Sequence, residues 1–388
     1  MKWKLMEDAI SFMDKLKLAK FSLTTNQFTN GKKVRELEEE WNKWLGSKHS
    51  LFVSSGSTAN FLLVAAVKEL YGLKSGDKVL LPACTWMTNV APIIQLGLQP
   101  IFCDVQLTDF SFDEENLKFI AKKHKDIKLI FVTHLLGFSS KSRIDGVLEE
   151  LFPKAKIIDD VCESHGCKDN NFKKIGSNSL GATFSTYFGH HLTSIEGGFV
   201  STNNPELYDL MKMKRSHGLA RESQFFDDYA NKHLDIDRQF LFITDGYNFR
   251  NTELNAVLGL SQLKKLDKSI EIRNQNYAKF CSLLGSYEHL FTPIEYTPTS
   301  SNFSFPFICK STEILTNLKT KLIENGIEYR PIISGNLLRH PFLKDYSIIT
   351  KNKQTNADTV HDFGLYIGNS QFVGNKNLIK LEEILDDL

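Results

Sequence analysis

The sequence predicts an α/β fold, with a mostly parallel mixed sheet in a large domain and a smaller α+β domain at the C-terminal end. Three observations lead to this fold class. Short apolar runs alternate with longer amphipathic stretches over about the first 200 residues. After about residue 250 the pattern changes to long helical stretches with short strands between them. The length of 388 residues also suits two domains better than one core.

Seven apolar runs are predicted to be strands of the large sheet: residues 50–55, 78–83, 100–105, 127–136, 155–162, 181–188 and 197–202. The segment TANFLLVAAVKELYG, which follows the first run, has apolar residues at helical spacing and ends in glycine, so it predicts a helix. Helix-like segments also separate most of the later strands, and we therefore expect helices on both faces of the sheet. The last two strands are separated by few residues, which indicates that one of them runs antiparallel.

The C-terminal part begins with NTELNAVLGLSQLKKLDKSIEIRNQNYAKFCSLLG, which predicts one or two long helices starting near Glu253. A strand is expected at 301–309, and helices are expected near 311–325 and 376–387. We therefore divide the chain into an N-terminal arm with the large domain, residues 1–252, and the small domain, residues 253–388.

Composition excludes several classes of function. The net charge is +1 and no long basic run occurs, so nucleic acid is not expected as a partner, although a few local basic residues could bind an anionic small molecule. The N-terminus lacks an apolar signal-peptide region, and no apolar run approaches the roughly 18 residues of a membrane span. The six cysteines are scattered without CxxC spacing. A cytoplasmic protein without a metal site is the expectation.

The segments after the predicted strands are polar, and ligands of open α/β sheets bind at the carboxyl ends of strands. SSGSTAN follows the first strand; Gly56 would let the backbone approach a ligand, and Ser57 would cap the next helix. The free amides of such a helix suit a phosphate, although the same turn also occurs without any ligand. Trp86 in ACTWMTN is either a plate for a planar ligand or a partly buried core residue.

The fifth strand ends in IIDDVCESHG, and burying a carboxylate there is costly unless it has a partner such as a protonated ring nitrogen. Alternation along the strand does not decide whether Asp159 or Asp160 points inward. Ser185 at the mouth of the sixth strand and His190 in the turn after it complete the set. An anion site, an aromatic plate, a buried acid and a basic group are the contacts that pyridoxal 5′-phosphate (PLP) requires.

Six segments in a common order make the chain similar to the sugar aminotransferase family of fold type I PLP enzymes, which act on nucleotide-linked 4-keto sugars. They are FTNGKKVRELEEEW, SSGSTAN, LPACTWMTN, IIDDVCESHG, EGGFVSTN and GYNFRNTELNAVLGL. The resemblance implies an aspartate aminotransferase-like fold and a homodimer with shared active sites. By the same resemblance, Gly56, Ser57 and Ser185 would hold the cofactor phosphate, together with Asn248 of the partner subunit. Trp86 would stack on the ring and Asp160 would pair with the ring nitrogen. Glu163 would lie beside the ring oxygen.

This chain departs from the family at the catalytic position. The family has a lysine six residues before the glutamate of EGG, whereas here His190 lies six residues before Glu196. No lysine occurs between Lys174 and Lys212. Imidazole cannot form the stable covalent link to the cofactor that lysine forms, so the cofactor would be held noncovalently, most naturally as pyridoxamine phosphate (PMP). The choice of His190 over the adjacent His191 rests on this spacing.

Histidine still moves protons near neutral pH, which suits a dehydratase better than an aminotransferase. The stretches RSHGLARE and YFGHHLTSIEGG resemble a family branch with this substitution, the GDP-4-keto-6-deoxy-D-mannose 3-dehydratases. The resemblance implies loss of the C3 hydroxyl of a nucleotide-linked 4-keto-6-deoxyhexose as water, with His190 as acid and base and L-glutamate restoring PMP. Candidate contacts to the diphosphate or to glutamate are Arg221, Arg250 and Arg330, and the resemblance adds His217.

Alternative functions are a 4-aminotransferase slowed by the missing lysine, and a non-catalytic regulator that only binds the cofactor. A related CDP-sugar 3-dehydrase with an iron–sulfur cluster is disfavoured, since no cysteine occurs between Cys167 and Cys281. The histidines lack metal-ligand spacing such as HExxH, so no metal site is expected.

Overall fold

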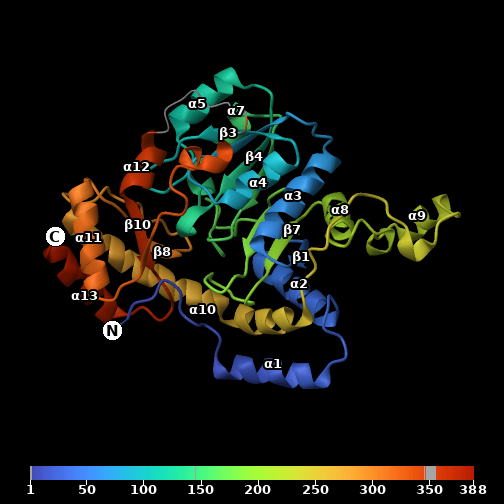
Figure 1. The fold of residues 1–388 in the computed structure, drawn as a ribbon, viewed down its shortest axis with the longest axis horizontal. Helices are drawn as coiled ribbons and strands as arrows, with labels where there is room; N and C mark the ends of the chain where they lie inside the picture. Colours follow the sequence, from blue (N-terminus) through green and yellow to red (C-terminus); the bar gives the residue numbers. More distant parts are fainter. Residues whose placement is uncertain (1, 145, 345, 347–354) are drawn as a thin grey trace.

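The computed structural model describes residues 2–144, 146–344, 346 and 355–388. Its large sheet has seven strands in the order β1-β7-β6-β5-β4-β2-β3 (Figure 1). Their bounds are β1 His49–Val53, β2 Lys78–Pro82, β3 Gln99–Cys103, β4 Ile127–Thr133, β5 Lys156–Asp160, β6 Ala182–Ser185 and β7 Gly198–Thr202. All seven lie within or within one residue of the runs predicted from the sequence.

The sheet is parallel except at β7, which pairs antiparallel with both β6 and β1. The register of β6 and β7 sets Phe184 opposite Phe199, and that of β1 and β7 sets Phe52 opposite the same residue. The expected antiparallel strand is therefore confirmed. The parallel strands β2 to β6 end at the same edge of the sheet, so the segments that follow them gather there.

Ten helices accompany this sheet in the described ranges. They are α1 Phe12–Thr24, α2 Lys32–Leu45, α3 Gly56–Leu70, α4 Met87–Gln95, α5 Glu114–Lys123, α6 Lys141–Ile144, α7 Val147–Leu151, α8 Pro205–Arg215, α9 Phe226–Lys232 and α10 Glu253–Leu284. One core cluster joins α3, α4 and α8 to side chains of one face of the sheet, such as Val79 and Val200. A second cluster joins α2 and α10 to strand residues that alternate with these, such as Phe199. A third joins α5 and α7 to other such residues, for example Leu80.

Helices therefore cover both faces, as predicted. The aromatic packing is tight on the α2 side, where Trp41 stacks on Phe199 with ring centroids 4.2 Å apart. Because both faces are buried, each strand is apolar along its whole length, which is why the strands read as continuous runs in the sequence.

The C-terminal part has a three-stranded antiparallel sheet in the order β8-β10-β9. Its elements are β8 Ser304–Ile308, α11 Thr312–Glu324, β9 Tyr329–Pro331, α12 Thr355–Phe363, β10 Gly364–Gly368 and α13 Asn375–Asp386. The stretch predicted as one or two helices is the single helix α10, which packs on α1 and α2 and also on α13 and β8. The division of the chain at residue 252 stays a prediction.

Two further features are relevant to function. In Figure 1, the segment around α9 extends from the body of the molecule as an arm. No helix in the described part of the chain is long and apolar enough to cross a membrane.

Candidate active site

A cavity of about 430 Å³ lies where the carboxyl ends of the large sheet face β9 and β10. Its lining combines segments after β1, β2, β4, β5 and β6 with residues of the small sheet and of the N-terminal segment. Eight of the twelve predicted site residues line it: Gly56, Ser57, Trp86, Asp160, Glu163, Ser185, His190 and Arg330.

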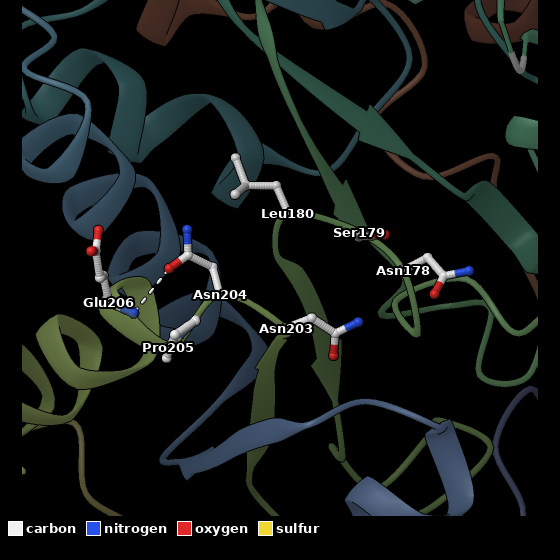
Figure 2. A pocket seen from close by; sticks show the side chains of 7 residues that line it. All are labelled: Asn178, Ser179, Leu180, Asn203, Asn204, Pro205 and Glu206. Atoms are coloured by element: carbon white, nitrogen blue, oxygen red, sulfur yellow. Dashed lines mark hydrogen bonds between the residues drawn. The ribbon is translucent and has the colours of Figure 1, made fainter.

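A second hollow, of about 510 Å³, lies at the opposite edge of the sheet, before β6 and after β7 (Figure 2). It is shallow, and Asn204 caps α8 there by accepting from the amide of Glu206 at 2.9 Å. None of the predicted site residues lines it. The smaller cavity is therefore the candidate site.

The start of α3 forms one corner of the cavity. The side chain of Ser55 caps the helix by accepting from the amide of Thr58 at 3.1 Å, and the Thr58 hydroxyl accepts from the Ser55 amide. The sequence prediction of Ser57 as the cap was wrong, because the helix begins at Gly56 and the cap is the residue before it. Ser57 is exposed in the first helical turn, where backbone amides have no intrahelical partners.

Ser185, the last residue of β6, faces this corner. A Cβ atom on Gly56 would lie 2.6 Å from Cβ of Ser185 and 3.1 Å from Sγ of Cys162. Any larger residue than glycine at position 56 would therefore collide with the neighbouring strand ends. Helix amides and a serine hydroxyl thus meet at the edge of the sheet, an arrangement that suits an anion.

Asp160 is the carboxylate that faces the cavity. Its Oδ1 accepts from the amide of Cys162 at 2.8 Å, and its Oδ2 accepts from Nδ2 of Asn60 at 3.0 Å. Asn60 is itself held by the hydroxyl of Thr183, which donates to its Oδ1 at 2.5 Å. These three contacts fix the orientation of the carboxylate.

Asp159 points to the opposite face of β5, as adjacent residues of a strand must. It is fully buried, and it pairs with Nζ of Lys141 at 2.8 Å and with Nε2 of His134 at 3.2 Å, while Ser179 also donates to it. Burial alone would raise the pKa of Asp159, but attraction from Lys141 and the contact with His134 outweigh it and hold that pKa well below its usual range. Asp159 is thus a structural ion-pair residue.

Glu163 lies beside Asp160 in the cavity lining and accepts from the amide of Leu136 at 3.0 Å. Burial raises the pKa of Glu163 to about 7; the Leu136 hydrogen bond opposes this rise, and repulsion from Asp160 adds to it. A carboxyl group with such a pKa is partly protonated near neutral pH. It can therefore donate a hydrogen bond to an oxygen of a ligand.

His190 occupies the turn after β6, where its amide donates to the carbonyl of Tyr187 at 3.0 Å. The half-buried ring lies 5.6 Å from the ring of Phe303, and its Nδ1 has no hydrogen-bond partner among the described residues. Burial lowers the pKa of His190 to about 4, and repulsion from Arg273 contributes. The imidazole is therefore neutral at physiological pH and free to accept a proton.

His191 does not line the cavity. It is buried, and its Nε2 donates to the carbonyl of Ser301 at 3.1 Å. The described residues that line the cavity include no lysine. The only imidazoles in the described lining are those of His190 and His134, and His134 is engaged with Asp159.

Trp86 and Arg330 close the cavity on its exposed side. Trp86 precedes α4 and is 55% exposed, so the alternative of a core tryptophan was wrong. Arg330 lies on β9 opposite Tyr366 of β10, and both line the cavity. An exposed indole and a guanidinium at the mouth are suited to a flat or an anionic group.

Four predicted site residues lie outside the cavity: Asn248, His217, Arg221 and Arg250. Three of them form a group on the exterior, where Arg250 Nε donates to the side chain of Asn248 at 3.1 Å and Arg250 Nη2 lies 3.4 Å from Nε2 of His217. Arg221 is exposed and donates to the carbonyl of Gln239 at 3.2 Å.

Sequence reasoning missed several residues that build the site. Asn60, which does not line the cavity but holds Asp160, stands in the SSGSTAN segment one turn into the helix, and a helical projection from Gly56 would have placed it on the inner face. Met6 and Leu5 line the cavity from the N-terminal segment, which no local signal connects to it. Among the described residues, no group of three or more histidines, cysteines and carboxylates could hold a metal ion.

The seven-stranded sheet, the helix N-terminus beside a strand-end serine and the fixed carboxylate together define an aminotransferase-fold protein of the PLP-dependent class. The chain belongs to the DegT/DnrJ/EryC1/StrS aminotransferase family, whose sequence profile matches residues 13–378. The predicted family and fold class are thereby confirmed.

Individual relatives agree with this assignment. The chain is 36% identical over 375 residues to a GDP-4-keto-6-deoxy-D-mannose 3-dehydratase of Yersinia pseudotuberculosis, covering 94% of this chain and 93% of that one. It superposes on an Escherichia coli GDP-4-keto-6-deoxy-D-mannose-3-dehydratase with bound hydrated PLP at a TM-score of 0.91, with 30% identity and 99% of both chains covered. A GDP-4-keto-6-deoxymannose-3-dehydratase with a trapped PLP-glutamate geminal diamine superposes at 0.89, with 30% identity and 99% and 100% coverage.

Proposed function

We propose that this protein is a PLP/PMP-dependent 3-dehydratase of a nucleotide-linked 4-keto-6-deoxyhexose, with GDP-4-keto-6-deoxymannose as the expected substrate and L-glutamate as the amino donor. The observation that carries the proposal is a neutral imidazole, His190, in a cavity whose described lining offers no lysine. The names of its relatives point to the same reaction. Glutamate as the donor is supported by the glutamate adduct in the third relative.

The residues present fit the cofactor. The amides of Gly56 and Ser57 with the hydroxyl of Ser185 would hold its phosphate, since a side chain larger than glycine's at position 56 would fill that corner. Trp86 would cover the ring, Asp160 would pair with the pyridine nitrogen, and Glu163 would donate to the ring oxygen. When bound, the cofactor supplies an amino group for attachment to the sugar ketone and a ring that accepts electrons.

In this proposal His190 moves the proton that elimination requires. Its neutral ring accepts a proton when substrate is bound, and the imidazolium then protonates the C3 hydroxyl, which leaves as water. Burial by apolar rings such as Phe303 limits competing hydration of the imidazole. Two hydrogen bonds, from the amide of Cys162 and from Asn60, hold the Asp160 carboxylate in one orientation for this role.

A homodimer with shared sites is part of the proposal. Asn248, His217, Arg221 and Arg250 lie outside the cavity of their own subunit and would reach that of the partner. The arm that carries α9 supports such an exchange, since it extends from the body (Figure 1) and exposes large apolar side chains. These are Phe225, Leu234, Ile236, Phe240 and Phe242. So many exposed apolar side chains on one arm indicate that this surface is buried in the interface between the subunits.

We propose the cytoplasm as the compartment. All six cysteines are free thiols, which is expected of a protein that folds under reducing conditions.

Two other functions make different predictions. A 4-aminotransferase would release a 4-amino sugar from the keto sugar and glutamate, without loss of the C3 hydroxyl. A regulator would bind the cofactor and form neither product. The discriminating experiment mixes the protein with PLP, glutamate and GDP-, CDP- or dTDP-linked 4-keto-6-deoxy sugars, and measures ammonia and sugar products by mass spectrometry.

We expect the GDP sugar to lose its C3 hydroxyl with release of ammonia and no net amination. The variants His190→Lys and His190→Asn separate the two roles of this position. The lysine variant is expected to bind the cofactor covalently and to lose dehydration by more than 100-fold, the range for a general acid or base. The asparagine variant is expected to lose dehydration without a covalent link. An active His190→Asn enzyme, or an accumulating 4-amino sugar, would overturn the proposal.

A further inference from the structure

A buried cluster of basic side chains lies against His190. His165 is fully buried with its ring 6.3 Å from that of His190, and His191 lies 5.6 Å from His165. The ring of Phe303 contacts His190 at 5.6 Å and His191 at 5.8 Å. Arg273 on α10 completes the cluster and is 5% exposed.

Arg273 is unusual because its buried charge has no carboxylate partner among the described residues. Its Nη1 donates to the carbonyl of Phe303 at 3.2 Å and to that of Asn369, while Nε has no partner in the same part of the chain. Removing a charged group from water is costly when only neutral dipoles hold it. Such a charge therefore calls for a physical explanation.

We propose that Arg273 is a positioning residue for His190: its buried charge keeps the adjacent imidazole in the uncharged form that accepts a proton. The proposal rests on the proposed acid/base role of His190. It adds that a group which contributes to this role, besides burial, lies on α10, more than 80 residues away in the sequence and outside the cavity lining.

The geometry connects the two groups through Phe303. Arg273 holds the backbone of Phe303, and the side chain of Phe303 packs against the ring of His190. The guanidinium is thus hydrogen-bonded to the backbone of the residue whose ring packs against the imidazole. Because Arg273 is buried and the His190 ring is half-buried, the repulsion between their positive charges is screened less than it would be at the surface.

The other groups that face His190 do not replace this charge. His191 and Tyr187 belong to the same turn as His190, and His165 follows β5. The charged groups of the cavity lining are Asp160, Glu163, Glu196 and Arg330. The carboxylates favour a charged imidazole and so oppose Arg273. The pKa values of His165 and His191 are themselves held well below normal, first by burial, with repulsion from neighbouring groups that include Arg273 adding to it.

The arrangement favours the uncharged resting form of His190 and the release of its proton, and it makes the imidazole a weaker base. A neutral His190 is ready to accept a proton, and the nearby positive charge makes the imidazolium that forms a stronger acid toward a leaving hydroxyl. A histidine without this charge would be partly protonated in slightly acidic solution and would donate its proton less readily.

The test is an NMR titration of the full chain with ¹³C-labelled histidine, without cofactor or substrate. The His190 signal is assigned by its loss in His190→Asn. We compare the wild type with Arg273→Met, which removes the charge, and with Arg273→Lys, which keeps it. The midpoint of His190 is expected to rise by about 1 pH unit, a tenfold gain in proton affinity, in Arg273→Met. It is expected to stay near the wild-type midpoint in Arg273→Lys.

A purely structural role would affect both variants alike, or would leave the midpoint unchanged. Either result, in protein that unfolds cooperatively in urea, overturns the proposal. If Arg273→Met does not fold, Arg273→Gln replaces it, since glutamine can still donate to the two carbonyls. The titration needs no turnover, so a failed dehydration assay with a shifted midpoint would refute the proposed function and leave the role of Arg273 intact.

Discussion

The substitution Asn60→Leu tests how the fold prepares Asp160. Asn60 is buried, donates to Asp160 at 3.0 Å and accepts from Thr183 at 2.5 Å. Leucine has a similar volume, so the change removes the amide without leaving a large cavity. Asp160 then loses the Asn60 donor and keeps its contact with the amide of Cys162.

The expected loss follows from these contacts. A hydrogen bond to a charged group contributes about 1.5–3 kcal/mol and a neutral one about 1 kcal/mol, so the free energy of unfolding should fall by about 2–4 kcal/mol. Asp160 also becomes free to rotate away from a ring nitrogen in the cavity. If the rotation weakens the interaction of Asp160 with the ring nitrogen by about 1.4 kcal/mol, the affinity for PLP falls about tenfold.

Urea denaturation without cofactor and a fluorescence titration with PLP measure the two effects separately. Asn276→Leu is the matched control, because Asn276 is a buried asparagine on α10 that donates to the carbonyl of Val373 at 3.0 Å. It should lose stability and keep its affinity for PLP. The reasoning would be refuted if Asn60→Leu bound PLP like the wild type, or if the control lost affinity equally.

Two more predictions concern the surroundings of the site. In Gly189→Ala the new methyl group would meet Sδ of Met6 and lie 2.8 Å from its Cγ, so stability should fall by about 1 kcal/mol. The double variant with Met6→Ala should restore most of that loss in urea denaturation; equal stability of single variant and wild type would contradict the contact. Asp159→Asn should cost about 3 kcal/mol at pH 7, because it breaks a buried ion pair with Lys141. The pKa of Asp159 is lowered in the folded state, so its contribution to the free energy of unfolding is present above the unfolded pKa of about 3.9. This contribution is lost as the pH falls below that value. The stabilities of wild type and variant should therefore become equal in acid.

The sequence by itself determined the strands, the fold class and the exceptional histidine. Both faces of the sheet are buried, so strands such as β4 are continuous apolar runs between turn residues and are visible locally. His190 and Glu196 are six residues apart in the connection between β6 and β7. Over so short a segment, the spacing in the sequence largely determines where the two residues lie relative to each other. The family segments were informative for the same reason.

Tertiary structure decided what depends on direction or on distant contacts. Strand alternation left the choice between Asp159 and Asp160 open, and the family resemblance favoured Asp160. The neighbours of each face, Lys141 on one side and Asn60 on the other, give the physical difference between them. The contact from Asn60 to Asp160 joins residues 100 positions apart, and that from Arg273 to the wall of His190 depends on how α10 crosses the molecule. No local pattern encodes such contacts, because they arise from packing of elements whose order in the sheet differs from their order in the chain.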